Sequence, residues 1–265
     1  MAATILDKIL KFKRDEVAAA RKSMSLSQLQ EAISQAPETR SLKAALSGDE
    51  LAIIAELKKA SPSAGVIREP FVVEELAASY LNYSATALSV LTDSHFFQGS
   101  LKYLKRLRKM SDVPLLRKDF IIDSYQVYEA RANHADAILL IVAALEESEL
   151  RELMGLCYSL NMEALVEVHS EEEADVALRC NAPIIGVNNR DLATFSIDLA
   201  TTERLAELLP KSTCLVAESG LATGMDGVRM QQAGAQAVLI GSHFMRHANP
   251  GLALKQFRAE MQTCR

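Results

Sequence analysis

Charged and polar residues close a series of short apolar runs along this chain of 265 residues. The run IIAELKK ends with Glu56 and Lys58, PLLRKDF contains Lys118, and EALVEVH contains Glu167. Three later runs end in further polar groups: Asn188 and Arg190 in GVNNRD, Glu218 and Ser219 in LVAESG, and Gly241 and Ser242 in AVLIGSH. Lysines and glutamates in one place can act as the acid and base of a catalysed reaction. Strands that end in such groups are typical of a parallel β/α barrel, whose catalytic residues lie at the carboxyl ends of its strands. The pattern therefore predicts an enzyme.

The alternation of side chains along each strand directs these groups into the mouth of the barrel. Residues two apart on a strand share a face, so Ile54, Glu56 and Lys58 point the same way. The alternate residues are all apolar and should face the surrounding helices (Ile53, Ala55, Leu57). The same parity turns Lys118 and Glu167 inward. Such a cluster is costly to desolvate unless its charges pair, and pairing with partial burial can place lysine and glutamate pKa values on either side of neutrality. The alternative is a solvated rim of salt bridges.

Glycine and serine follow the last two predicted strands, where a phosphate can bind. ESG ends with Gly220, and IGSH contains Gly241 and Ser242. Loops after strands seven and eight of this fold are a recurrent phosphate site, because their backbone N–H groups can approach an oxyanion. The loop KKASPSAG adds Ser61 and Ser63. Glycine after a strand usually only makes a turn, so the prediction depends on finding both motifs at these two strands.

Eight apolar runs alternate with segments of helical periodicity, which predicts a single (β/α)8 TIM barrel with parallel strands. The predicted strands are 51–57, 87–91, 114–118, 137–142, 163–168, 184–188, 214–218 and 237–241. The predicted helices are 73–84, 100–110, 123–133, 146–160, 170–180, 199–209, 224–233 and 250–262. An open doubly wound sheet is the alternative, but no GxGxxG motif follows the first strand.

The first strand is preceded by an N-terminal helical extension, residues 1–46, within one domain of residues 1–265. Its helical patterns lie near 4–22, 26–35 and 41–46. Two interpretations stay open. The extension can be a plug under the bottom of the barrel, or it can cross to the top and form part of a substrate lid.

Composition excludes several classes of function. A net charge of −5 argues against a nucleic-acid or membrane-surface partner, because both call for clustered positive charge. Four cysteines without CxxC spacing and five scattered histidines give no metal-ligand pattern. No segment reads as a secretory signal or a transmembrane helix. We therefore expect a cytoplasmic enzyme with a small anionic substrate. The sequence has no long apolar stripe or coiled-coil heptad that would indicate an oligomer, so a monomer is expected.

The strand-end motifs together resemble the indole-3-glycerol phosphate synthase family of tryptophan biosynthesis. The similar motifs are IAELKKASPS, SVLTDSHFFQGS, LRKDFIID, ALVEVH, GVNNRDL, VAESGL and LIGSHFM, in the family's order and across essentially the whole chain. The helical extension is also typical of this family. The resemblance implies a carboxy-lyase that closes 1-(o-carboxyphenylamino)-1-deoxyribulose 5-phosphate to indole-3-glycerol phosphate. Carbon dioxide and water are lost, and no metal or organic cofactor is used.

The resemblance also implies a role for each strand-end residue. Lys118 is expected to be the principal general acid, and Lys58 to pair with the substrate carboxylate and share the acid role during dehydration. Glu167 matches the general base, while Glu56 and Asn188 are expected to orient the lysines and the substrate hydroxyls. The remaining positions are expected to bind the phosphate (Ser61, Gly220, Gly241, Ser242) or to line the mouth (Arg190, Glu218, Ser219).

The chain has no tryptophan, so other residues must form the wall for the anthranilate ring. Phe97, Leu91 and the N-terminal helix are the candidates, whereas His95 and His169 are interpreted as bystanders. Two other functions stay open. One is an enzyme like phosphoribosylanthranilate isomerase, whose family typically has a cysteine where this chain has Glu56 and Lys58. The other is a barrel that binds a sugar phosphate without catalysis.

Overall fold

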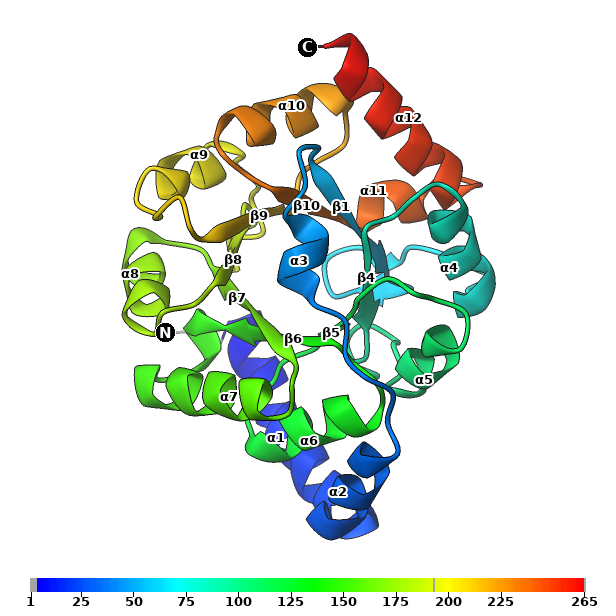
Figure 1. The fold of residues 1–265 in the computed structure, drawn as a ribbon, viewed down its shortest axis with the longest axis vertical. Coiled ribbons are helices and arrows are strands. Elements are labelled where there is room, and N and C mark those ends of the chain that lie inside the picture. Colours follow the sequence, from blue (N-terminus) through cyan, green and yellow to red (C-terminus); the bar gives the residue numbers. More distant parts are fainter. Residues whose placement is uncertain (1–3, 193, 265) are drawn as a thin grey trace.

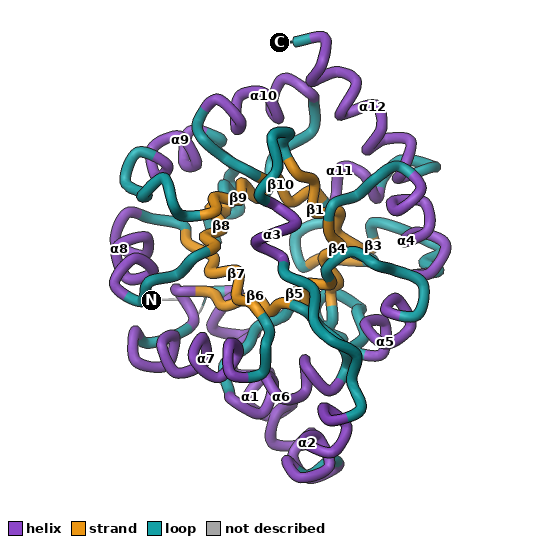
Figure 2. Tube along the Cα trace, viewed as in Figure 1, coloured by secondary structure: helices purple, strands orange, loops and turns teal. Residues whose placement is uncertain are grey.

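The structure is a computed structural model that describes residues 4–192 and 194–264. Eight parallel strands form a closed barrel in the order β1-β10-β9-β8-β7-β6-β5-β4, which appears as a ring in Figure 2. The barrel strands are β1 (Ala52–Leu57), β4 (Ala87–Leu91), β5 (Leu115–Lys118), β6 (Ala137–Ile141), β7 (Glu163–Val168), β8 (Ile184–Asn188), β9 (Cys214–Glu218) and β10 (Ala237–Ile240). The predicted TIM barrel is confirmed, with each strand close to its predicted range.

The barrel strands are continuous apolar runs because both of their faces are buried. Ile53, Ala55 and Leu57 of β1 belong to the core between the strands and the outer helices. Ala52 and Ile54 point the other way and pack inside the barrel. The predicted parity is therefore confirmed for β1, and it carries Glu56 onto the inner side at the carboxyl end of the strand.

The helices lie outside the barrel ring, where the apolar periodicity predicts them (Figure 1). They are α4 (Val73–Asn82), α5 (Lys102–Arg108), α6 (Ser124–Ala132), α7 (Glu147–Ser159), α8 (Glu171–Arg179), α9 (Ala200–Ala206), α10 (Gly224–Gln232) and α12 (Pro250–Thr263). Several begin at a side-chain cap, such as Ser170 before α8 and Thr223 before α10, which satisfies backbone N–H groups of the first turn.

Four short elements were not predicted. β2 (Ala60–Ser61) pairs antiparallel with β3 (Gly65–Val66) in the loop after β1. A 3-10 helix, η1 (Val142–Ala144), follows β6, and α11 (Ser242–Met245) follows β10. These segments are too short for hydrophobic periodicity to show them.

The N-terminal extension serves both ends of the barrel. It contains α1 (Ile5–Ser23), α2 (Leu26–Ser34) and α3 (Leu42–Leu46). Leu42 and Leu46 are fully buried inside the bottom of the barrel. Figure 1 is viewed from this end, and α3 lies over the centre of the barrel. α1 packs beside α6 and reaches the carboxyl ends of β4 and β5 through Lys13. α3 therefore plugs the bottom of the barrel, as the first interpretation expects. α1 lies at the top of the barrel, where the second interpretation places the extension.

No helix within the described residues is both long and apolar enough to cross a membrane. The four cysteines are free thiols; Cys264 is exposed, and the other three are buried.

Candidate functional site

A pocket of about 730 Å³ opens at the carboxyl ends of the strands. Every residue that the sequence analysis singled out for a site lines this pocket: Glu56, Lys58, Ser61, Phe97, Lys118, Glu167, Asn188, Arg190, Glu218, Ser219, Gly220, Gly241 and Ser242. They come from β1, β5, β7, β8, β9 and the loops or short helices that follow the strands. The barrel thus brings together residues that lie far apart in sequence.

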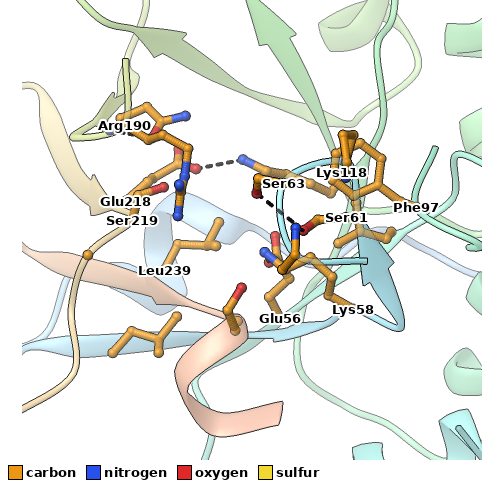
Figure 3. Close-up of a pocket in the computed structure, with 18 of the residues that line it drawn as sticks. Glu56, Lys58, Ser61, Ser63, Phe97, Lys118, Arg190, Glu218, Ser219 and Leu239 are labelled. Atoms are coloured by element: carbon orange, nitrogen blue, oxygen red, sulfur yellow. Dashed lines mark hydrogen bonds and ion pairs between the residues drawn. The ribbon is translucent and has the colours of Figure 1, made fainter. Parts of the chain in front are cut away.

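Lys118, the last residue of β5, lies between two carboxylates. Its Nζ atom is 2.8 Å from Oε2 of Glu167 and 2.6 Å from Oε2 of Glu218. Figure 3 shows Lys118 directed across the pocket towards Glu218. Burial disfavours the ammonium, but the charges of Glu167, Glu218 and Glu56 outweigh it and raise the pKa of Lys118 above its usual range. The lysine therefore holds its proton in the substrate-free protein.

Several neighbouring groups stabilise the ionised form of Glu167. Burial acts to raise its pKa, but Lys118 and His169 hold that pKa well below its usual range. Asn188 donates from Nδ2 to Oε1 of Glu167 over 3.2 Å and accepts from the backbone N–H of Arg190. Asn188 is expected to orient the lysines and the substrate hydroxyls, and in the structure its side chain contacts Glu167, the partner of Lys118.

Glu218 has a pKa close to neutral pH. Burial raises the pKa of Glu218 to about 7, with a further contribution from Glu167 and against the opposing effect of Lys118. Its second oxygen, Oε1, is buried without a hydrogen-bond partner among the described residues. A Cβ at Gly186 would lie 2.2 Å from this oxygen, so glycine there makes room for the carboxylate. From the sequence, Glu218 is expected only to line the mouth of the barrel.

Glu56 and Lys58 form a second ion pair at the end of β1. Nζ of Lys58 lies 2.6 Å from Oε2 of Glu56, which is 3 % exposed. Glu56 also packs against Gly241, where a Cβ would lie 2.1 Å from its Oε2 atom. This close approach gives Gly241 a reason to be glycine beyond the turn that it makes. It also brings the end of β1 to the start of α11.

Residues from opposite sides of the barrel line the pocket. Arg190, Glu218 and Ser219 lie opposite Ser61 and Phe97 in Figure 3. Ser219 and Gly220 adopt positive φ angles of 67° and 82°, the left-handed region that non-glycine residues rarely adopt. This strained turn directs the chain past the pocket straight after β9.

The apolar part of the pocket has contributions from all three predicted sources. Phe97 and Leu91 line it, and so do Ile5, Leu6 and Ile9 of α1. The amphipathic pattern of α1 predicts a buried stripe, but amphipathicity alone does not identify the surface that the stripe covers.

Lys13 is a functional candidate that the sequence analysis missed. Its side chain is fully buried, and Nζ lies 2.9 Å from both Asp93 and Asp119. Asp119 follows Lys118 directly, and Oδ1 of Asp93 accepts hydrogen bonds from the backbone N–H groups of Phe96 and Phe97. The missed signal was a lysine on the apolar face of the predicted N-terminal helix.

The two histidines differ in their surroundings. His95 is exposed and stacks on Phe12 of α1, with ring centroids 4.1 Å apart. His169, which the sequence analysis interprets as a bystander, lies 3.3 Å from Oε1 of Glu167 and is therefore a direct neighbour of a candidate catalytic residue. No group of three or more metal-ligand side chains gathers within residues 4–192 and 194–264.

Comparison with known proteins agrees with the motifs. The family model for indole-3-glycerol phosphate synthase matches residues 6–257. A protein of this name from Polaromonas sp. is 47 % identical over 256 residues, which cover 95 % of this chain and 97 % of that protein. Another, from Paracidovorax citrulli, is 46 % identical over 263 residues, 96 % of this chain and 99 % of that protein.

Solved structures with low sequence identity share the fold. Thiamine phosphate pyrophosphorylase from Pyrococcus furiosus superimposes with a TM-score of 0.61 at 17 % identity, covering 80 % of this chain and 96 % of that one. KGPDC from Streptococcus mutans gives 0.62 at 15 % identity, covering 81 % and 99 %. At such identities the likeness concerns the barrel alone.

Proposed function

Because the chain belongs to the indole-3-glycerol phosphate synthase family, the carboxy-lyases of tryptophan biosynthesis, we propose how its pocket carries out their reaction. The substrate is 1-(o-carboxyphenylamino)-1-deoxyribulose 5-phosphate. The ring carbon that bears the carboxylate bonds to the ribulose carbonyl carbon, carbon dioxide leaves, and loss of water completes the indole. The observation that carries the proposal is the Lys118 ammonium, held between two glutamates at the base of a pocket with apolar and cationic walls.

The two ends of the substrate fit different walls. Phe97, Leu91 and the apolar residues of α1 provide a surface for the anthranilate ring. Ser61, Gly220, Gly241 and Ser242 provide hydroxyl and backbone donors for the phosphate at loops that follow β1, β9 and β10. Arg190 and Lys58 add positive charge for the anionic groups. Binding the remote phosphate orients the reacting chain over Lys118.

Lys118 acts as the principal general acid. The raised pKa of Lys118 makes it too weak an acid to protonate the carbonyl oxygen before the carbon–carbon bond starts to form. The oxygen becomes an alkoxide as the carbon–carbon bond forms, and an alkoxide is basic enough to take the proton. The ammonium therefore stabilises charge that develops only in the transition state, which is how such groups accelerate reactions.

The other charged residues support this step and the dehydration. Lys58, positioned by Glu56, pairs with the substrate carboxylate and shares the acid role when the hydroxyl leaves as water. Glu167, positioned by Asn188, is the general base that the resemblance implies. Glu218 has the pKa better matched to a base near neutral pH. It therefore stands as the second candidate for accepting the proton in the dehydration.

We propose further that the chain is one domain of residues 1–265 with 1–46 as its extension, and that it acts as a cytoplasmic monomer. A net charge of −5 supports the absence of nucleic-acid and membrane partners. The side chains of the pocket can supply each proton transfer, so the proposal includes no cofactor.

The test is the appearance of indole absorbance and fluorescence when the protein meets the substrate in chelator-treated buffer. The protein has no tryptophan, which keeps its own signal low. Lys118→Ala is expected to lower kcat by at least about a hundredfold, while Lys109→Ala, an exposed lysine on the barrel exterior, should behave as wild type. Substrate binding without product in the wild type would favour the non-catalytic barrel. Near-normal turnover by Lys118→Ala would rule out the acid assignment.

A further inference from the structure

His169 lies just beyond β7, between a pocket residue and the first turn of α8. It follows Val168, the last residue of the strand, and its side chain is 11 % exposed. The cap residue Ser170 comes next and starts α8, which carries Glu173 back towards the ring. The imidazole therefore occupies a fixed position where the strand joins the helix.

Both ring nitrogens of His169 face carboxylates. Nδ1 lies 3.0 Å from Oε2 of Glu173, and the backbone N–H of His169 donates to the same oxygen over 2.8 Å. Nε2 is buried without an aligned hydrogen bond from the described residues and lies 3.3 Å from Oε1 of Glu167. A neutral imidazole has one N–H and one lone pair, so one nitrogen would present its lone pair to a carboxylate. The doubly protonated ring avoids this repulsion.

The charges around the ring favour the same form. Burial alone would lower the pKa of His169, but the carboxylates of Glu167 and Glu173 raise it to about 10. Glu167 in turn faces Lys118 from β5 and Asn188 from β8. Glu167 therefore has two cationic neighbours, Lys118 and His169, and Lys118 gives up its proton in the proposed reaction.

We propose that His169 is a positioning residue which, as an imidazolium held by Glu173, keeps the Glu167 carboxylate paired and in place while Lys118 transfers its proton. This inference rests on the proposed role of Lys118. When Lys118 becomes a neutral amine, Glu167 would otherwise be a buried anion without a cation, which is a costly state. The imidazolium remains charged throughout the step and carries no proton to the substrate.

The protonation of His169 can be measured independently of activity. Protein labelled with 15N-histidine is titrated by NMR, and His169→Asn identifies the signal. The ring of His169 is expected to stay doubly protonated above pH 8 in the wild type. In Glu173→Gln its midpoint should move down by at least about one pH unit, because one of two carboxylate partners is lost. An ordinary midpoint near 6.5 in the wild type would overturn the proposal.

Kinetics then separate positioning from a merely structural role. In Glu173→Gln, kcat should fall with rising pH as His169 loses its proton, whereas the wild type keeps its activity over that interval. His169→Asn should lower kcat roughly tenfold with KM within about twofold, because the asparagine supplies a donor without the charge. Glu171→Gln removes an exposed carboxylate from the same turn and should leave the profile unchanged.

The outcomes distinguish this inference from the proposed function. If Glu173→Gln and Glu171→Gln share the wild-type pH profile, or if His169→Asn keeps full kcat, the positioning role is wrong even where the ring is an imidazolium. A wild type without turnover would contradict the proposed function, and the NMR titration would still show whether the imidazolium exists.

Discussion

Lys118 contacts two carboxylates whose pKa values are shifted in opposite directions. Glu167 is stabilised as an anion by Lys118 and His169, whereas burial raises the pKa of Glu218 to about 7. Glu167 has His169 as a second cationic neighbour, whereas Glu218 has only a share of Lys118, so the buried Glu218 anion is not fully compensated. The ionised form of Glu218 therefore destabilises the folded protein, and the same raised pKa suits Glu218 to accept a proton in the pocket.

Glu218→Gln tests this shift through stability. The pKa of Glu218 is raised in the folded protein, so its proton stabilises the fold in acid, and this contribution is lost as pH rises through about 7. The wild type should lose on the order of 2 kcal/mol relative to Glu218→Gln between pH 5 and pH 8. Thermal unfolding midpoints at both pH values measure this, with the exposed Glu207→Gln as control. A difference that does not change with pH would contradict the shift.

Ser242→Ala tests the phosphate contact. Hydrogen bonds to a charged group contribute about 1.5–3 kcal/mol, so removal of the hydroxyl should raise KM roughly 10–100-fold with kcat changed little. Steady-state kinetics measure the split, and Ser47→Ala at the opposite end of the barrel is the matched control. A fall in kcat at unchanged KM would place Ser242 in the chemical step instead.

At the scale of elements, Lys13 connects three parts of the pocket. It reaches from α1 to Asp93, which organises the backbone at Phe97, and to Asp119, which follows Lys118. Arg117 and Thr92 also contact Asp119, so its pKa lies below the usual range despite burial. One buried lysine thus fixes the helix beside the apolar wall to the strand that carries the acid.

Lys13→Met should destabilise the protein by about 3–5 kcal/mol, because it leaves Asp93 and Asp119 buried with less positive charge. The thermal midpoint should fall accordingly, whereas Lys11→Met, at an exposed position of α1, should change it little. If the variant stays folded, KM should rise as α1 and the Phe97 backbone loosen. Equal midpoints for the two variants would show that the ion pairs do not hold the helix.

The sequence predicts the barrel strands well because each is an apolar run with a clear end. β7, β8 and β9 have the predicted bounds, and residue parity places Glu56 on the inner side. Other features depend on partners that the sequence does not show. α1 and α3 are both amphipathic, yet one lies at the mouth and the other in the bottom of the barrel. Similarly, the distinct acidities of Glu167 and Glu218 depend on distances to Lys118 that only the folded barrel sets.

The whole molecule separates stability from catalysis along the barrel axis. The pocket lies at the carboxyl ends of the strands, and α3 fills the opposite end. Glu163, at the start of β7, accepts hydrogen bonds from Ser41 and from the backbone N–H of Lys43, which fixes α3 there. The N-terminal extension thus contributes to both functions through different helices, as expected for a fold whose two ends have different tasks.

Leu46→Ala and Ile5→Ala test this division as a pair. Leu46 is fully buried in the bottom of the barrel, so its truncation should cost about 2–5 kcal/mol of stability and leave kcat and KM near wild type. Ile5 lines the pocket and is only partly buried, so its truncation should raise KM several-fold, since about 1–2 kcal/mol of apolar contact is lost, with a smaller loss of stability. Thermal unfolding and steady-state kinetics on both variants give the comparison. If Leu46→Ala raised KM as much as Ile5→Ala does, strain would pass through the barrel core from the plug to the pocket, and the two ends would act as one unit.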